Sequence, residues 1–171
     1  MKKIFIVRHA KSSRNPEYLI DFERPIIQKG MERATRISKK LKDTGEIPWV
    51  ILSSSARRAK ETANIFSENL GGVKIVLRDE LYSNPNAIFE IMSGMEYHDC
   101  DSIMIVGHNP DMEDFIYEIT GLNVEMTTSS VCLIESETGD WKNMNKTNSF
   151  IKLHFWGDGD EEEEIQPDMS E

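Results

Sequence analysis

Each of three apolar stretches in the sequence is followed closely by basic or histidine side chains. Arg8 and His9 follow the first stretch, Arg58 follows the second after a serine-rich turn, and His108 follows the third. A guanidinium group offers planar paired donors that suit phosphate oxygens, and a neutral imidazole nitrogen can attack phosphorus. A second, protonated imidazole would stabilise the equatorial oxygens as negative charge spreads over them. The residue types therefore predict a site for phosphoryl transfer.

Each of these residues also has a purely structural interpretation. An Arg-His pair is usually a surface or cap feature, Arg57 and Arg58 could form a solvated helix start, and His108 could hydrogen-bond within a turn. An arginine beside the positive end of a helix dipole is unfavourable, however, unless an anion binds there. The histidines are not accompanied by the cluster of Asp and Glu that holds Mg²⁺. We therefore interpret the group as an anion site without a metal or a cofactor.

Alternating strand and helix patterns position these residues. Runs of β-branched and aromatic residues predict strands at 3–7, 49–53, 74–77, 102–106, 131–136 and 150–155. Apolar residues spaced by three and four predict helices between them, and Met31, Ala34, Ile37 and Leu41 share one face of the first helix. This order predicts an α/β protein, a three-layer α/β/α sandwich whose last two strands are antiparallel neighbours. In such sheets, ligands bind at the carboxyl ends of the strands.

The charge divides the chain of 171 residues into two parts. Residues 157–171 carry eight acids and no base, so the net charge of −10 falls to −2 over residues 1–156. We expect one domain over 1–156, followed by an acidic C-terminal tail that solvates the protein. The alternative is an autoinhibitory tail whose carboxylates enter the anion pocket. The acidic balance and the lack of a wide basic face argue against nucleic acid as a partner.

The composition also bears on location. The longest apolar runs are about five residues, well short of the ~18–20 that a membrane helix needs. Arg8 and His9 interrupt the first run before it reaches the length of a signal peptide. We therefore expect a cytoplasmic protein with no membrane partner. Cys100 and Cys132 lack a metal-binding or redox spacing and are interpreted as reduced thiols.

Four ordered motifs resemble the histidine phosphatase superfamily, and most closely its small SixA-type phosphohistidine phosphatases. Residues 7–12 (Val-Arg-His-Ala-Lys-Ser) are similar to the first motif, and residues 21–26 are similar to the Arg-Pro-Leu segment. Residues 54–63 are similar to the Ser-Pro-x-x-Arg-Ala-x-Gln-Thr motif, and residues 106–110 complete the set. The departures are a Ser for the Pro and a Glu for the Gln of the third motif, and an Ala for the usual Gly of the first. None is an expected phosphate ligand.

The resemblance implies a phosphoglycerate-mutase-like fold with a mostly parallel sheet and an antiparallel edge. It also implies that His9 is the nucleophile that becomes phosphorylated, and that Arg8, Arg58 and His108 complete the phosphate pocket. The motif selects Arg58 rather than Arg57, because Arg58 is the one followed by Ala-x-x-Thr. We expect Arg57 to lie on the surface.

The resemblance further suggests a proton donor near the end of the third strand. Glu80 lies in about the right place, although Asp79 is adjacent and a solvated loop carboxylate is the plain alternative. Three aromatic residues, Tyr82, Trp141 and Trp156, are candidates for a substrate rim, and core packing explains them as well.

The segment that would cover the site is short, and it guides the choice of substrate. Residues 79–101 leave room for at most one short helix, so we expect an open site that admits a phosphorylated side chain on a protein. The predicted function is removal of a phosphoryl group from phosphohistidine on a protein, through a phosphohistidine on the enzyme. The alternatives are a broad-specificity phosphomonoesterase for small molecules and a catalytically silent module that binds phosphoproteins.

Overall fold

The protein is described by a computed structural model that covers residues 1–15, 17, 20–94 and 97–157. The strands are β1 (Lys2–Arg8), β2 (Val50–Ser53), β3 (Lys74–Leu77), β4 (Ser102–Gly107), β5 (Val131–Ser136) and β6 (Ser149–Phe155). The α-helices are α1 (Gln28–Asp43), α2 (Arg57–Asn69), α3 (Glu80–Ser83), α4 (Ala87–Ser93) and α5 (Asp111–Thr120), and the 3₁₀ turns are η1 (Asp21–Glu23) and η2 (Trp141–Asn143). The acidic tail predicted at 157–171 lies, apart from Gly157, outside the described residues.

The strands form one sheet in the order β3-β2-β4-β1-β5-β6. The four strands β3, β2, β4 and β1 run parallel to one another, whereas β5 is antiparallel to both β1 and β6. The predicted parallel sheet with an antiparallel edge is therefore confirmed, including the pairing of the last two strands.

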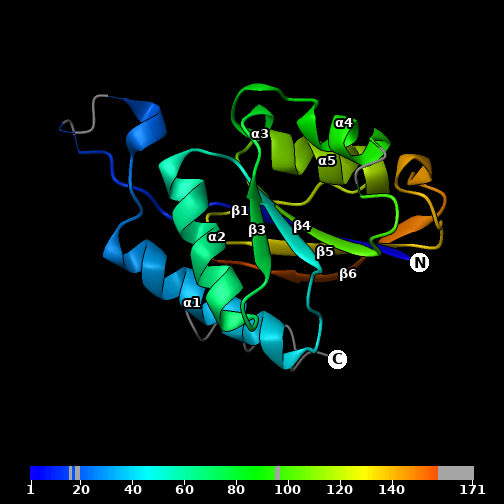
Figure 1. The fold of residues 1–171 in the computed structure, drawn as a ribbon, viewed down its shortest axis with the longest axis horizontal. Coiled ribbons are helices and arrows are strands. Elements are labelled where there is room, and N and C mark those ends of the chain that lie inside the picture. Colours follow the sequence, from blue (N-terminus) through cyan, green and yellow to red (C-terminus); the bar gives the residue numbers. More distant parts are fainter. Residues whose placement is uncertain (16, 18–19, 95–96, 158–171) are drawn as a thin grey trace.

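Helices cover both faces of this sheet (Figure 1). Along β1 the side chains alternate, so that Phe5 and Val7 pack on one face while Ile4 and Ile6 pack on the other. The Phe5 face is covered by α1 and α2, through residues such as Ile37. The opposite face is covered by the three helices α3, α4 and α5. The three-layer sandwich predicted from the alternating patterns is confirmed.

The segment between β3 and β4 contains two short helices, α3 and α4, so the expectation of at most one was wrong. The reason is that this segment has enough apolar side chains to pack both turns onto the sheet: Leu81, Ile88 and Ile91 are all buried. Met31, by contrast, is 45% exposed and does not join the buried face of α1. The buried row of α1 runs through Gly30, Ala34, Ile37 and Leu41, and Met31 lies beside this row.

Candidate active site

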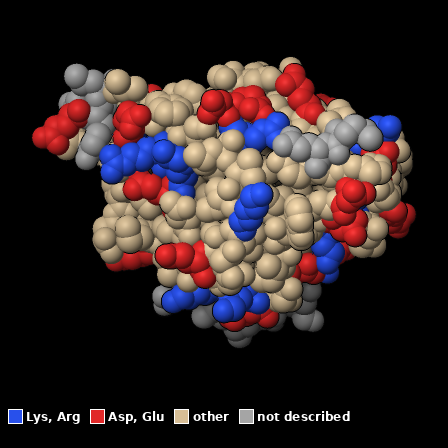
Figure 2. Space-filling model, in the orientation of Figure 1, with Lys and Arg blue, Asp and Glu red and all other residues tan. Residues whose placement is uncertain are grey.

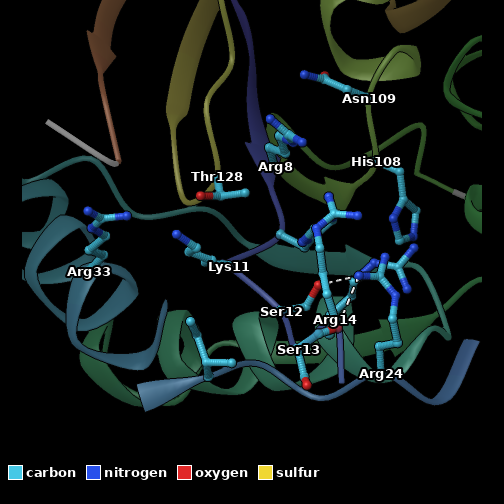
Figure 3. Close-up of a pocket in the computed structure, with 13 residues that line it drawn as sticks. Arg8, Lys11, Ser12, Ser13, Arg14, Arg24, Arg33, His108, Asn109 and Thr128 are labelled. Carbon is cyan, nitrogen blue, oxygen red and sulfur yellow. Dashed lines mark hydrogen bonds between the residues drawn. The ribbon is translucent and has the colours of Figure 1, made fainter. Parts of the chain in front are cut away.

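The three predicted groups meet at the carboxyl ends of neighbouring parallel strands. His9 directly follows β1, Ser54 directly follows β2, and His108 directly follows β4. These ends open on a cavity of about 620 Å³ (Figure 3). Its lining contains all four residues predicted for the phosphate pocket. The described residues of the lining are Arg8, His9, Lys11, Ser12, Ser13, Arg14, Arg24, Ile27, Arg33, Arg58, His108, Asn109 and Thr128.

The His9 ring is held in one tautomer. Its Nδ1 lies 2.8 Å from the carbonyl oxygen of Ala10, and a carbonyl only accepts, so Nδ1 carries the proton. The lone pair is therefore on Nε2. Burial, together with the smaller effect of the nearby charges of His108, Arg58 and Arg8, lowers the pKa of His9 to about 3. The ring is thus neutral at pH 7, as a nucleophile requires, with burial rather than positive charge as the main cause.

Backbone contacts fix the chain around His9. Its N–H donates to the carbonyl of Gly107 at 3.0 Å, which ties it to the end of β4. The next N–H, that of Ala10, donates to Thr62 Oγ1 at 2.8 Å, and this hydroxyl donates in turn to the carbonyl of Arg58 at 2.7 Å. Thr62, the last polar residue of the third sequence motif, therefore connects the loop that carries His9 and Ala10 to the first turn of α2.

His108 lies beside His9, with 5.2 Å between the ring centroids. Its Nε2 is 2.9 Å from Ser54 Oγ, while its Nδ1 is buried and has no hydrogen-bond partner among the described residues. Burial, with a smaller effect of the positive charge of Arg58, lowers the pKa of His108 to about 4. The protein groups alone thus keep this ring neutral at pH 7, in contrast to the protonated second imidazole expected from the sequence. A phosphate dianion would favour protonation and raise this pKa.

The two predicted arginines are held by separate parts of the chain. Arg8 Nη1 donates to the carbonyl of Met126 at 3.0 Å, and Asn109 Nδ2 donates to the same oxygen at 2.9 Å. Arg58 lies in the first turn of α2 and is 6% exposed. Its Nη1 and Nη2 donate to the carbonyl and the carboxylate of Asp21, at 2.8 and 3.0 Å.

Asp21 is a site residue to which the sequence analysis assigned no role. Its carboxylate accepts hydrogen bonds from Arg58 and from the hydroxyl of Tyr82, the latter at 2.8 Å, and it forms an ion pair with Arg24. Although partial burial opposes the shift, the hydrogen bonds from Tyr82 and Arg58 lower the pKa of Asp21 to about 2. The Tyr82 ring also packs edge-on against His108, with centroids 5.5 Å apart. The sequence feature that could have pointed to Asp21 was the second motif, in which Asp21 and Arg24 are three residues apart.

The remaining predicted residues lie outside the cavity lining. Glu80 forms an ion pair with Arg78, with 2.5 Å between Oε1 and Nε, and does not line the cavity. Arg57 is exposed, as expected, and its Nε lies 3.7 Å from Glu61 Oε1. Trp141 is 2% exposed and belongs to the core rather than to a rim.

This arrangement can bind a phosphate dianion and accept a phosphoryl group. Arg8 and Arg58 can supply planar donors, His108 can supply a further donor when protonated, and His9 Nε2 carries a lone pair that can attack phosphorus. Across the described ranges, no group of three or more His, Cys, Asp or Glu side chains is arranged to hold a metal ion.

The family model of the histidine phosphatase superfamily (branch 1) matches residues 4–101. The chain therefore belongs to the histidine phosphatase superfamily, and the resemblance read from its four motifs is confirmed. An uncharacterized chloroplastic protein of Arabidopsis thaliana is 25% identical over 151 residues, which cover 82% of this chain and 69% of that protein.

Solved structures show the same fold. A protein assigned as the phosphohistidine phosphatase SixA of Agrobacterium tumefaciens superimposes with a TM-score of 0.77 at 23% identity, over 90% of this chain and 97% of that one. The protein histidine phosphatase SixA in complex with tungstate superimposes with a TM-score of 0.76 at 16% identity, over 91% and 97%. The chain is thus a phosphatase of this superfamily with a SixA-like fold.

Proposed function

We propose that the protein removes the phosphoryl group from phosphohistidine on another protein. The phosphate docks between Arg8 and Arg58, and His9 Nε2 attacks phosphorus in line with the leaving imidazole. The P–N bond of the substrate breaks, its electron pair goes to the leaving nitrogen, and the leaving imidazole takes up a proton from solvent. Water then attacks phosphorus, releases inorganic phosphate and regenerates neutral His9.

The observation that carries this proposal is the state of His9. A group that only binds phosphate would gain from a positive charge, whereas this ring is held neutral by burial, with its lone pair confined to Nε2 by the Ala10 carbonyl. This is the state that nucleophilic attack on phosphorus requires. The silent binding module is therefore the weaker interpretation.

Two features support phosphohistidine on a protein as the substrate. No described residue of the segment between β3 and β4 lines the cavity, because α3 and α4 pack onto the sheet instead. A bulky phosphorylated surface can thus approach the site. Transfer of the phosphoryl group from one imidazole to another is also nearly symmetric, so its rate depends little on a proton donor. This agrees with the position of Glu80, whose role as a donor stays a prediction.

The reaction is proposed to need no metal, since Arg8, Arg58 and His108 can neutralise the phosphate charge. The location also stays a prediction. No helix in the described part of the chain is long and apolar enough to cross a membrane. The cytoplasm was expected from the sequence, and the Arabidopsis relative is described as chloroplastic.

The test compares hydrolysis of a histidine-phosphorylated phosphotransfer protein with that of para-nitrophenyl phosphate, both in the presence of EDTA. We expect a large preference for the phosphoprotein, lost in His9→Ala and kept in Arg57→Gln, which changes an arginine outside the cavity. Equal or better turnover of the aryl phosphate would contradict the proposal in favour of a general phosphomonoesterase. Binding of the phosphoprotein without turnover of either substrate would favour the binding module.

A further inference from the structure

The cavity carries more positive charge than one phosphate group uses. Six basic side chains line it and no Asp or Glu is among its described lining residues. The basic residues are Arg8, Lys11, Arg14, Arg24, Arg33 and Arg58. In Figure 2, one group of Lys and Arg atoms lies near the amino-terminal end of α2, with Asp and Glu atoms beside it. Arg8 and Arg58 suffice for a phosphate dianion, so the role of the others needs a separate explanation.

Lys11 and Arg33 are brought together by a close approach of α1 to the chain after β1. A Cβ atom on Gly30 would lie only 2.3 Å from the carbonyl oxygen of Lys11, so glycine at this position permits the contact. That carbonyl also accepts from the N–H of Ile27, at 3.0 Å. Arg33 follows Gly30 by about one helical turn and lies on the same side of α1. Both side chains point into the space beside Thr128 (Figure 3).

These two cations, like Arg14, differ from Arg24 and Arg58 in their partners. Arg24 and Arg58 are paired with Asp21. Within the described ranges, neither Lys11 nor Arg33 forms a hydrogen bond or ion pair through its side chain. Two like charges that share a cavity repel each other, and an anion between them would remove this cost. The pair therefore has the chemistry of an anion site.

We propose that Lys11 and Arg33, with the hydroxyl of Thr128, form a second anion site that binds an Asp or Glu side chain near the phosphohistidine of the partner protein. This inference rests on the proposed function and adds that the partner surface is acidic. A protein is favoured over a small dianion because Lys11 is exposed at the rim of the cavity. A small metabolite gains most from an enclosed subsite, whereas a rim charge reaches a neighbouring surface.

The test uses two synthetic phosphohistidine peptides that differ only in their flanking residues, Asp and Glu in one and Ser and Ala in the other. The chain is assayed at full length, as wild type and as Lys11→Gln/Arg33→Gln. We expect the wild type to prefer the acidic peptide by about tenfold in kcat/KM, mainly through KM, since the rim ion pairs act on binding. In the double variant this preference should fall to near one. Lys39→Gln, which changes an exposed lysine of the same helix away from the cavity, should keep it.

Binding separates this inference from the proposed function. A stable phosphohistidine analogue in the same two peptides is titrated by calorimetry into His9→Ala, with and without the two glutamine substitutions. Tighter binding of the acidic peptide that depends on Lys11 and Arg33 supports the second anion site, even if the wild type hydrolyses neither phosphohistidine peptide and the proposed function fails. Equal binding of the two peptides to His9→Ala overturns the second anion site. So does a preference that survives the double substitution.

Discussion

Thr62→Val tests whether one hydroxyl fixes the position of the loop that carries His9 and Ala10. Thr62 is fully buried, and its Oγ1 accepts from the N–H of Ala10 while donating to the carbonyl of Arg58. Valine keeps the shape of the side chain but leaves the Ala10 N–H buried without an acceptor, which costs about 1–3 kcal/mol. For a domain of this size, the midpoint of thermal unfolding should fall by roughly 2–12 °C.

The matched control is Thr35→Val. Thr35 makes the same bond to the carbonyl four residues earlier, that of Met31 at 2.8 Å, but its hydroxyl accepts nothing from another part of the described chain. We expect it to change the free energy of unfolding by less than about 0.5 kcal/mol.

Urea unfolding of the two variants, followed by circular dichroism, measures the difference between them. In Thr62→Val, kcat should also fall, because Ala10 supplies the carbonyl that sets the His9 tautomer. Equal stability losses in the two variants would refute the role assigned to Thr62.

Three further predictions concern the charges of the site. Arg58→Lys should lower kcat/KM by about 100-fold, because lysine lacks the planar donors that bind phosphate and Asp21 together. Asp21→Asn should lower it at most about fivefold, because this carboxylate is half-exposed and such ion pairs contribute under ~1 kcal/mol. The free energy of unfolding should decrease as the pH falls from about 6.5 to 4. Burial lowers the pKa of His9 to about 3, and the pKa values of His108 and His154 to about 4. In this pH range the unfolded chain therefore binds protons that the folded chain does not. The free energy of unfolding should fall by up to about 1.4 kcal/mol per pH unit for each of these histidines.

Each of these has a contradicting result. Steady-state kinetics showing near wild-type kcat/KM for Arg58→Lys would remove this arginine from the phosphate pocket, and a loss for Asp21→Asn as large as that for Arg58→Lys would give the carboxylate a direct part in the reaction. Stability measured by urea unfolding that is flat between pH 6.5 and 4.5 would show that the histidines titrate normally. The carboxylate of Asp21, with a pKa of about 2, titrates below this window.

The location of the site was predictable because it depends on chain direction. Once residues 3–7 and 102–106 are recognised as parallel strands, His9 and His108 must lie at the same edge of the sheet. The order of hydrophobic runs carries that information. The His9 tautomer was also predictable in outline, since its partner is the adjacent residue.

The supporting contacts were not predictable, because they join segments far apart in the chain. Asp21 reaches Arg58 across 37 residues, and Thr62 reaches Ala10 across 52. Nothing in either local pattern encodes the other. Glu80 illustrates a different limit, since its position in the chain fits a proton donor while the guanidinium of Arg78, two residues away, holds its carboxylate.

The central claim is that His9 carries the phosphoryl group during turnover, and rapid-quench labelling tests it most directly. The wild type is mixed for milliseconds with a ³²P-phosphohistidine protein, quenched in alkali to preserve phosphohistidine, and digested for mass spectrometry. We predict acid-labile label on the peptide that contains His9, at Nε2, and none in His9→Gln. Label on a different residue, or undiminished turnover by His9→Gln, would contradict the account.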